Sequence, residues 1–237
     1  MGESTALSVY LRERRMAAGL ARTELAARAQ MAPLLISQIE SGALVPNSPM
    51  LQRLFDSLDV PLWYRKHILV LGLPALDSGT PPAAPTAEDL TDLASLTHPA
   101  CFQRFPTMDV LAANAEYQRL FPGLGAGVNA LEWMFLDPTA KKVFIDWTTE
   151  AQLLVHAFRM LAPLAPTQRV TAITESCGQS PDWDPIWTSD VRPQDIARRH
   201  LRIRERSTGI ERRLLLRIYD PAFPSRPWWL YRLIPAR

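Results

Sequence analysis

The sequence predicts two domains, an all-α domain followed by an α+β domain, and three observations support this prediction. Apolar residues recur at helical spacing through the first 75 residues, in short segments separated by glycine and proline. A stretch rich in proline follows. Near the C-terminus, apolar residues alternate with arginine at the period of two that is typical of strands. Helices that precede a set of antiparallel strands indicate an α+β domain.

The N-terminal domain, residues 1–75, is expected to hold five helices. Gly19 suits the position just after the first helix, because a residue without Cβ enters the left-handed conformation freely. Ser48 offers an N-cap for the fourth helix, with Pro49 in its first position. The expected helices cover residues 7–18, 23–29, 33–41, a segment that starts after Ser48, and 61–71. Their apolar faces are formed by Leu7, Leu11, Ala18, Leu25, Ala26, Ala29, Ile36, Ile39, Leu51, Leu54 and Leu58.

The second and third helices form a helix-turn-helix pattern, ARTELAARAQMAPLLISQIESG at residues 21–42. Such a pair can insert its second helix in the major groove of DNA, where side chains near the helix start read base edges. Gln38 offers an amide to adenine, Ser37 a hydroxyl to any base, and Leu34 an apolar contact to a thymine methyl. The candidate DNA contacts are Arg22, Thr23, Ala32, Pro33, Leu34, Ser37, Gln38 and, as a phosphate contact, Asn47.

The start of the third helix is unusually apolar. Pro33, Leu34 and Leu35 leave few groups there for hydrogen bonds to bases, so specificity is expected to rest also on DNA shape and dimer spacing. Ala21 and Ala32 lack the side-chain oxygen of a good N-cap. Each lack costs roughly 1 kcal/mol unless another group accepts the N–H groups at the helix start.

A linker is expected at residues 76–90, because the segment LPALDSGTPPAAPTA has four prolines and no periodic apolar face. The second domain, residues 91–237, opens with two short strands in HPACFQRF and MDVLAAN, followed by a helix at residues 115–120. A helical region at residues 129–161 is interrupted near Pro138. RHLRIRER, RRLLLRIY and WWLYRLI are expected to add three strands to an antiparallel sheet.

Two stretches of the chain resemble known families. Residues 7–60 are similar to the XRE-type helix-turn-helix domain through LRERRMAAGL, TELAARA and ISQIESG. Residues 91–237 resemble the ligand-binding domain of MmyB-like transcription regulators through HPACFQRF, NAEYQRLFP and NALEWMFLDPTAKKVFIDW. The resemblance implies a PAS-like second domain with a cavity for an apolar, fatty-acid-like ligand. It also implies that Arg15 is tied to Glu40, a structural role that we favour over a DNA contact.

The candidate ligand site is a group of mostly aromatic and apolar side chains in the second domain. Its residues are Phe102, Trp133, Met134, Phe135, Phe144, Trp147, Leu154, Phe158 and Arg159. Residues of these types at this spacing also form ordinary cores, so both interpretations stay open. A fatty-acid carboxylate would need a cation, since an unpaired charge is costly in an apolar cavity. The candidates are Arg159, His156, Arg202, Arg204 and Arg217, although the arginines also suit a solvated face.

Other classes of function find little support in the sequence. Cys101 and Cys177 are far apart and have no partner motif, which argues against a disulfide framework and a zinc site. GLGAG at residues 123–127 lacks the spacing of a dinucleotide loop, and Cys177 carries no nucleophile signature. We therefore expect no catalytic residue, metal or cofactor. Neither a signal sequence nor a membrane span is recognisable, so the protein is expected in the cytoplasm.

Together these patterns predict a transcription regulator that binds double-stranded operator DNA as a homodimer and responds to a small apolar ligand. The ligand would favour one of two dimer geometries, only one of which fits half-sites about one helical turn apart. The alternative is a protein-interaction module whose degenerate helix-turn-helix no longer reads DNA. Salt-dependent binding to DNA distinguishes the two functions.

Overall fold

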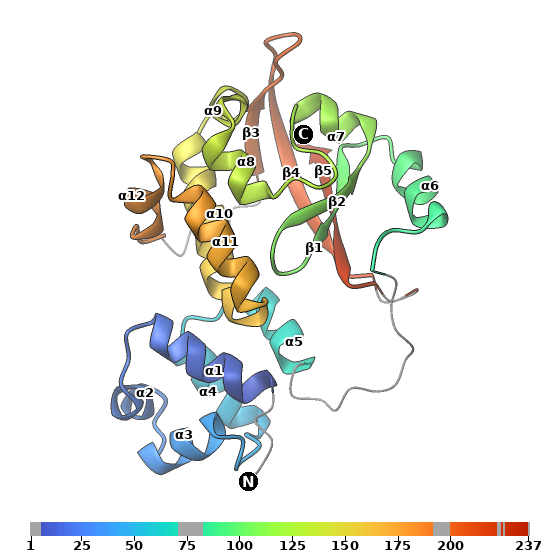
Figure 1. Cartoon of the computed structure of the whole chain (residues 1–237). Coiled ribbons are helices and arrows are strands. Elements are labelled where there is room, and N and C mark those ends of the chain that lie inside the picture. Colours follow the sequence, from blue (N-terminus) through green and yellow to red (C-terminus); the bar gives the residue numbers. More distant parts are fainter. Residues whose placement is uncertain (1–5, 71–82, 192–199, 222–223, 225, 237) are drawn as a thin grey trace. The chain divides into compact units, whose positions relative to one another are not determined.

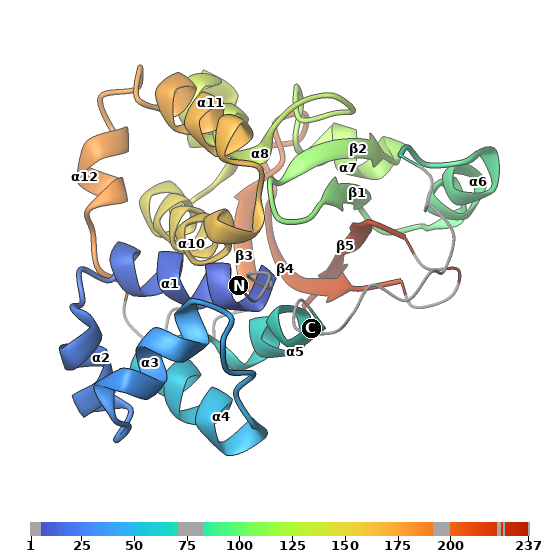
Figure 2. The ribbon, with the colours of Figure 1, turned by 60° about the horizontal axis from the view of Figure 1, so that its bottom comes forward.

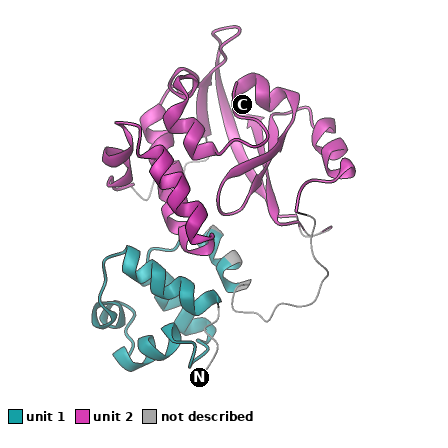
Figure 3. Cartoon of the chain, in the orientation of Figure 1, with its two compact units in different colours: residues 1–77 teal, residues 78–237 magenta. Residues whose placement is uncertain are grey.

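The chain forms two compact units, residues 1–77 and residues 78–237 (Figure 3). The computed structural model describes residues 6–70, 83–191, 200–221, 224 and 226–236. Part of the linker predicted at residues 76–90 therefore lies outside the described residues.

The first unit is all helical, as predicted (Figure 1). Its helices are α1 (Ala6–Ala17), α2 (Arg22–Arg28), α3 (Pro33–Glu40), α4 (Ser48–Ser57) and α5 (Leu62–Val70). Their bounds agree with the predicted ranges to within a residue or two. The predicted inner faces are confirmed, because Leu25, Ala26, Ile36, Ile39 and Leu54 are each at most 2% exposed.

Two details of the first unit differ from the prediction. Ala18 is exposed, and the buried position on that face of α1 is taken by Arg15. The N-cap of α4 is Asn47 and not Ser48, because the Asn47 side chain accepts a hydrogen bond from Met50 N at 3.0 Å. Ser48 would have to accept from Leu51 N, which already donates to the Asn47 carbonyl.

The second unit is built on a five-stranded antiparallel sheet, which confirms the predicted α+β class. The strands are β1 (Ala100–Arg104), β2 (Asp109–Ala113), β3 (His200–Arg204), β4 (Glu211–Tyr219) and β5 (Trp228–Pro235). Their order across the sheet is β2-β1-β5-β4-β3, so the C-terminal strand lies in the centre beside β1. The segment between β2 and β3 supplies most of the helices.

The helices of the second unit differ from the prediction in three places. Residues 87–90 of the predicted linker are helical, because Thr86 and Asp89 form a capping box that starts a helix. The region at residues 129–161 breaks at Pro138, as expected, and again after Val143, where Phe144 pairs with Ile203 of β3. Two helices after residue 164 were not predicted. The helices are α6 (Ala87–Ser95), α7 (Ala115–Leu120), α8 (Ala130–Leu136), α9 (Pro138–Val143), α10 (Trp147–Leu161), the 3-10 turn Ala162–Leu164, α11 (Thr167–Cys177) and α12 (Trp183–Trp187).

Helices α6 and α7 lie on opposite faces of β1. Leu93 of α6 packs with Phe102 and Trp228, whereas Tyr117 of α7 interacts with Cys101. Successive side chains of a strand point to opposite faces, which separates Phe102 from Cys101. Figures 1 and 2 show α6 beside the β1–β2 end of the sheet, and Figure 1 shows α9 beside β3.

Candidate DNA interface and candidate ligand site

The turn between α2 and α3 is fixed by its backbone. Met31 N donates to the Ala26 carbonyl at 2.9 Å, and Gln30 adopts a left-handed conformation with φ of 53°. Leu25 and Ala26 of α2 are buried together with Ile36 of α3. The turn and the shared core hold α3 with one face toward the interior and the other toward solvent.

The predicted DNA contacts lie on the solvent side of this pair. Arg22, Thr23, Ala32, Pro33, Leu34 and Asn47 are exposed, and Ser37 and Gln38 are half-buried. Leu34 is 67% exposed, so the front of α3 presents a large apolar side chain to solvent. The apolar character that the sequence indicates is therefore a surface property of this helix.

The starts of α2 and α3 have no side-chain N-cap, as Ala21 and Ala32 predict. The Glu24 carboxylate compensates in part for Ala21, since it accepts a hydrogen bond from the Ala21 N–H at 2.6 Å. A capping box has two hydrogen bonds, and the one from the N-cap N–H to the side chain at N3 needs no hydroxyl at the N-cap. The predicted cost of a missing cap is reduced at α2.

Glu40, at the end of α3, joins three helices through two arginines. Its carboxylate, 2% exposed, accepts hydrogen bonds from Arg15 Nε at 2.6 Å and from Arg22 Nε at 2.8 Å. Arg15 also donates to Glu40 Oε2 and to the Leu20 carbonyl, which confirms its structural role. Burial alone would raise the pKa of Glu40, but the hydrogen bonds from Arg15 and Arg22 outweigh it and lower the pKa.

Arg22 therefore has a structural contact as well as its predicted role at DNA. Its side chain is 52% exposed while its Nε donates to Glu40. An arginine has five N–H donors, so the contact with Glu40 leaves others for a phosphate. The ion pair holds the guanidinium at the start of α2, on the side of the predicted interface.

Arg53 is a candidate phosphate contact that the sequence did not single out. It is exposed on α4, and its Nη1 donates to the Gln30 carbonyl in the helix-turn-helix turn at 3.3 Å. Only the tertiary fold brings α4 to this turn, so spacing along the chain gives no signal for it.

The predicted ligand residues fall into separate groups in the second unit. Trp133 and Phe144 meet edge to face with centroids 6.2 Å apart, and both contact Phe121. Phe135 contacts Trp147 at 5.8 Å and Trp183 at 4.9 Å. These two aromatic groups surround α8, whose Met134 carbonyl accepts a hydrogen bond from the Trp147 indole.

Phe102 lies apart from both aromatic groups, in the cluster under α6 with Trp228. Phe158 is fully buried on α10, and Leu154 is half-buried on the same helix. The predicted site residues thus belong to the core on several sides of the unit. Burial of this kind fits a packed core and the wall of an apolar ligand site alike.

The sequence prediction missed Trp183, Trp187 and Phe121. Arg159 Nη1 donates a hydrogen bond to the Trp187 carbonyl at 2.8 Å, and the Arg159 guanidinium carbon lies 5.6 Å from the centroid of the Trp187 ring. Arg159 therefore ties α10 to α12, in addition to its predicted place at a ligand. Phe121 is the first residue after α7. In the sequence, only its aromatic side chain distinguishes it from an ordinary loop residue.

The strand arginines proposed for a carboxylate have other partners. Arg202 pairs with Asp146 and Glu211, and Arg204 pairs with Glu211 at 2.9 Å. Both side chains are more than half exposed, which fits the alternative of a solvated face. Arg217 is half-buried and donates to the Leu216 carbonyl.

The two cysteines are buried thiols without a disulfide. Burial raises the pKa of both Cys101 and Cys177 to about 12, so neither is a thiolate at neutral pH. Among the described residues, no cluster of histidine, cysteine and acidic side chains is suited to a metal ion. No helix in the same residues is long and apolar enough to cross a membrane.

Comparison with known families matches both units. Residues 6–62 match the helix-turn-helix domain, and residues 90–212, more than half of the chain, match the MmyB-like transcription regulator ligand binding domain. No curated protein matches the chain. The exposed front of α3 and the separate α+β unit agree with both matches. The protein therefore belongs to the MmyB-like transcription regulators and combines a DNA-binding helix-turn-helix domain with a ligand-binding domain.

Proposed function

We propose that the protein binds operator DNA as a homodimer through α3, and that an apolar, fatty-acid-like ligand in the second unit changes its affinity for DNA. The observation that carries the proposal is the exposed front of α3 in a chain that also has a ligand-binding domain. The aromatic groups around α8 support the proposal, because sites for apolar ligands are lined mostly by apolar and aromatic side chains.

Ligand can act on DNA binding only if its affinity differs between two conformations of the protein. In a homodimer, the two α3 helices must be spaced to reach half-sites about one helical turn apart. A ligand that favours one dimer geometry therefore raises or lowers the affinity for an operator. This mechanism needs no contact between ligand and DNA.

A titration of the full-length protein with DNA from upstream of its own gene tests the proposal, at several salt concentrations. We expect specific binding that weakens steeply as salt rises, since phosphate contacts release counterions. Binding that is absent at low salt would favour a protein-interaction module instead. Native mass spectrometry of the same sample reports the subunit number and any lipid that is bound.

Gln38→Ala and Arg22→Ala are expected to weaken DNA binding in different ways. Loss of the Gln38 amide should cost about 1–3 kcal/mol at the operator and relax its sequence preference. Loss of Arg22 should weaken specific and nonspecific DNA alike and reduce the salt dependence. Binding titrations with operator and scrambled DNA measure both effects. Gln118→Ala, an exposed change on α7, is the control, and an equally weak effect of all three variants would contradict the assignment.

A further inference from the structure

A surface pocket of about 480 Å³ lies between α9 and the hairpin that joins β3 to β4. Its volume falls within the range of small-molecule sites. The side chains of Lys141, Lys142, Arg204 and Arg206 line it together with Phe144, Ile145, Glu205 and Gly209. Cations thus outnumber acids around the pocket by four to one.

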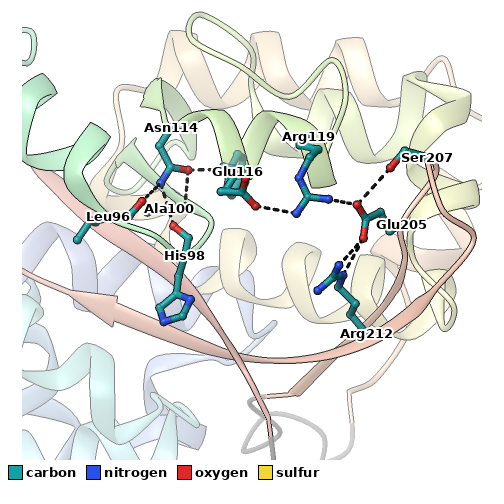
Figure 4. Close-up of polar contacts among 10 residues, drawn as sticks. Leu96, His98, Ala100, Asn114, Glu116, Arg119, Glu205, Ser207 and Arg212 are labelled. Carbon is teal, nitrogen blue, oxygen red and sulfur yellow. Dashed lines mark hydrogen bonds and ion pairs between the residues drawn. The ribbon is translucent and has the colours of Figure 1, made fainter.

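Glu205 does not neutralise these cations, because its carboxylate already forms ion pairs with two other arginines. Its carboxylate, 2% exposed, forms ion pairs with Arg119 of α7 and with Arg212 of β4, the latter at 2.7 Å (Figure 4). Ser207 donates to it as well. Neither arginine lines the pocket. The acid therefore anchors the hairpin and leaves the charge of the pocket positive.

Two of the four cations have acidic partners nearby. Lys141 pairs with Asp182, and Arg204 pairs with Glu211. Lys142 and Arg206 are exposed and have no acidic partner in the part of the chain that the structure describes. The pocket thus holds two uncompensated positive charges on two different elements, α9 and the β3–β4 hairpin.

The elements that carry these two cations are held in place. Within the hairpin, Glu205 N donates to the Ile210 carbonyl at 2.9 Å and Gly209 N to the Glu205 carbonyl at 2.7 Å. Gly209 has φ of 71°, a conformation that favours glycine at this turn. On the other side, Ile145 N donates to the Arg202 carbonyl at 3.0 Å, which fastens the end of α9 to β3. A rigid frame lowers the entropic cost of binding a ligand.

We propose that this pocket binds a small organic dianion, with its charged group between Lys142 and Arg206 and an apolar part against Phe144 and Ile145. Two unpaired cations match two negative charges, and arginine and lysine are the usual partners of phosphate and carboxylate groups. The site is separate from the apolar interior proposed for a fatty-acid-like ligand. Phe144 connects them, since its ring also contacts Trp133 and Phe121.

Isothermal titration of the full-length protein tests the site with three probes that share one aromatic ring. Phenyl phosphate and phthalate carry two negative charges, whereas phenol carries none. We expect one site per chain for at least one dianion, weaker binding at higher salt, and at least about tenfold weaker binding of phenol. The tighter of the two dianions identifies the charged group as phosphate or carboxylate. Equal binding of phenol, or no binding of either dianion by titration and by thermal shift, would overturn the proposal.

Substitutions test whether the dianion binds in this pocket. Lys142→Ala and Arg206→Ala are each expected to weaken the bound dianion about tenfold, with an unchanged thermal midpoint because both side chains are exposed. Arg213→Ala, an exposed arginine of β4 outside the pocket, is the matched control and should leave the affinity unchanged. An equal loss in the control would show nonspecific attraction and overturn the site. DNA binding is measured separately, so failure here leaves the proposed function testable by itself.

Discussion

Glu40→Ala is expected to destabilise the helix-turn-helix unit by about 3–5 kcal/mol, the usual cost of removing one partner from a buried ion pair. The change leaves Arg15, whose side chain is 11% exposed, without the carboxylate that neutralises it. A domain of this size has a total stability of about 5–15 kcal/mol. Most DNA binding should therefore be lost at temperatures where the wild type is folded. Denaturant unfolding of the full-length protein, with amide hydrogen exchange to assign the transition to residues 6–70, measures the effect.

A graded series of variants distinguishes the loss of the Glu40 ion pair from a general destabilisation of α3. Glu40→Gln keeps an oxygen acceptor for Arg15 and should cost less than Glu40→Ala. Arg22→Ala removes only the exposed partner and should cost less than about 1 kcal/mol, even though it weakens DNA binding. Glu13→Gln, a change of a half-buried acid on α1 whose side chain is 43% exposed, is the control, with an effect within about 0.5 kcal/mol. Equal stability of the Glu40→Ala and Glu13→Gln variants would contradict the structural role of Glu40.

The same ion pair gives the stability of this unit a pH dependence of known sign. The pKa of Glu40 lies below its ordinary value of 4.5 in the folded protein, so the unfolded chain binds a proton more readily. The stabilisation is therefore complete above pH 4.5 and is lost as the pH falls through the lower pKa of the folded state. The Glu40→Gln variant should lack this part of the acid dependence.

The N-terminal helices could be predicted well because their signals are local. Gly19 has the left-handed φ that its place after α1 predicted, and the apolar spacing of α2 and α3 matches their buried faces. The errors are equally local. Asn47 and Ser48 are both good N-cap residues, and only the hydrogen bond to Met50 shows which one caps α4.

The second unit was harder to predict wherever a contact crosses a long stretch of sequence. The break after Val143 is stabilised by pairing of Phe144 with Ile203, 59 residues later, and no helix-breaking residue marks it. Trp183 and Trp187 join the aromatic group of Phe135 only because α12 folds back on α10. The cationic pocket likewise combines α9 with the β3–β4 hairpin, so neither segment alone indicates it.

Asn114→Ala is expected to destabilise the second unit by about 3–5 kcal/mol, since one buried side chain there satisfies four backbone groups. Asn114 Oδ1 accepts from Ala100 N and Tyr117 N, both at 3.0 Å, and Nδ2 donates to the carbonyls of Leu96 and His98 (Figure 4). These contacts join the end of α6, the start of β1 and the start of α7. The N-cap position of Asn114 before α7 accounts for only one of these four hydrogen bonds, the one from Tyr117 N.

Variants at Asn114 distinguish an N-cap from this wider junction. Asn114→Asp keeps the cap to Tyr117 N but turns a carboxylate oxygen toward two carbonyl oxygens, so it should be nearly as destabilising as alanine. Asn47→Ala removes an exposed N-cap of the same residue type and should cost only about 1 kcal/mol in the first unit. Denaturant unfolding with hydrogen exchange of residues 83–120 measures the change. If Asn114→Asp were as stable as the wild type, the cap alone would explain the residue, because the two amide hydrogen bonds would then contribute nothing to the junction.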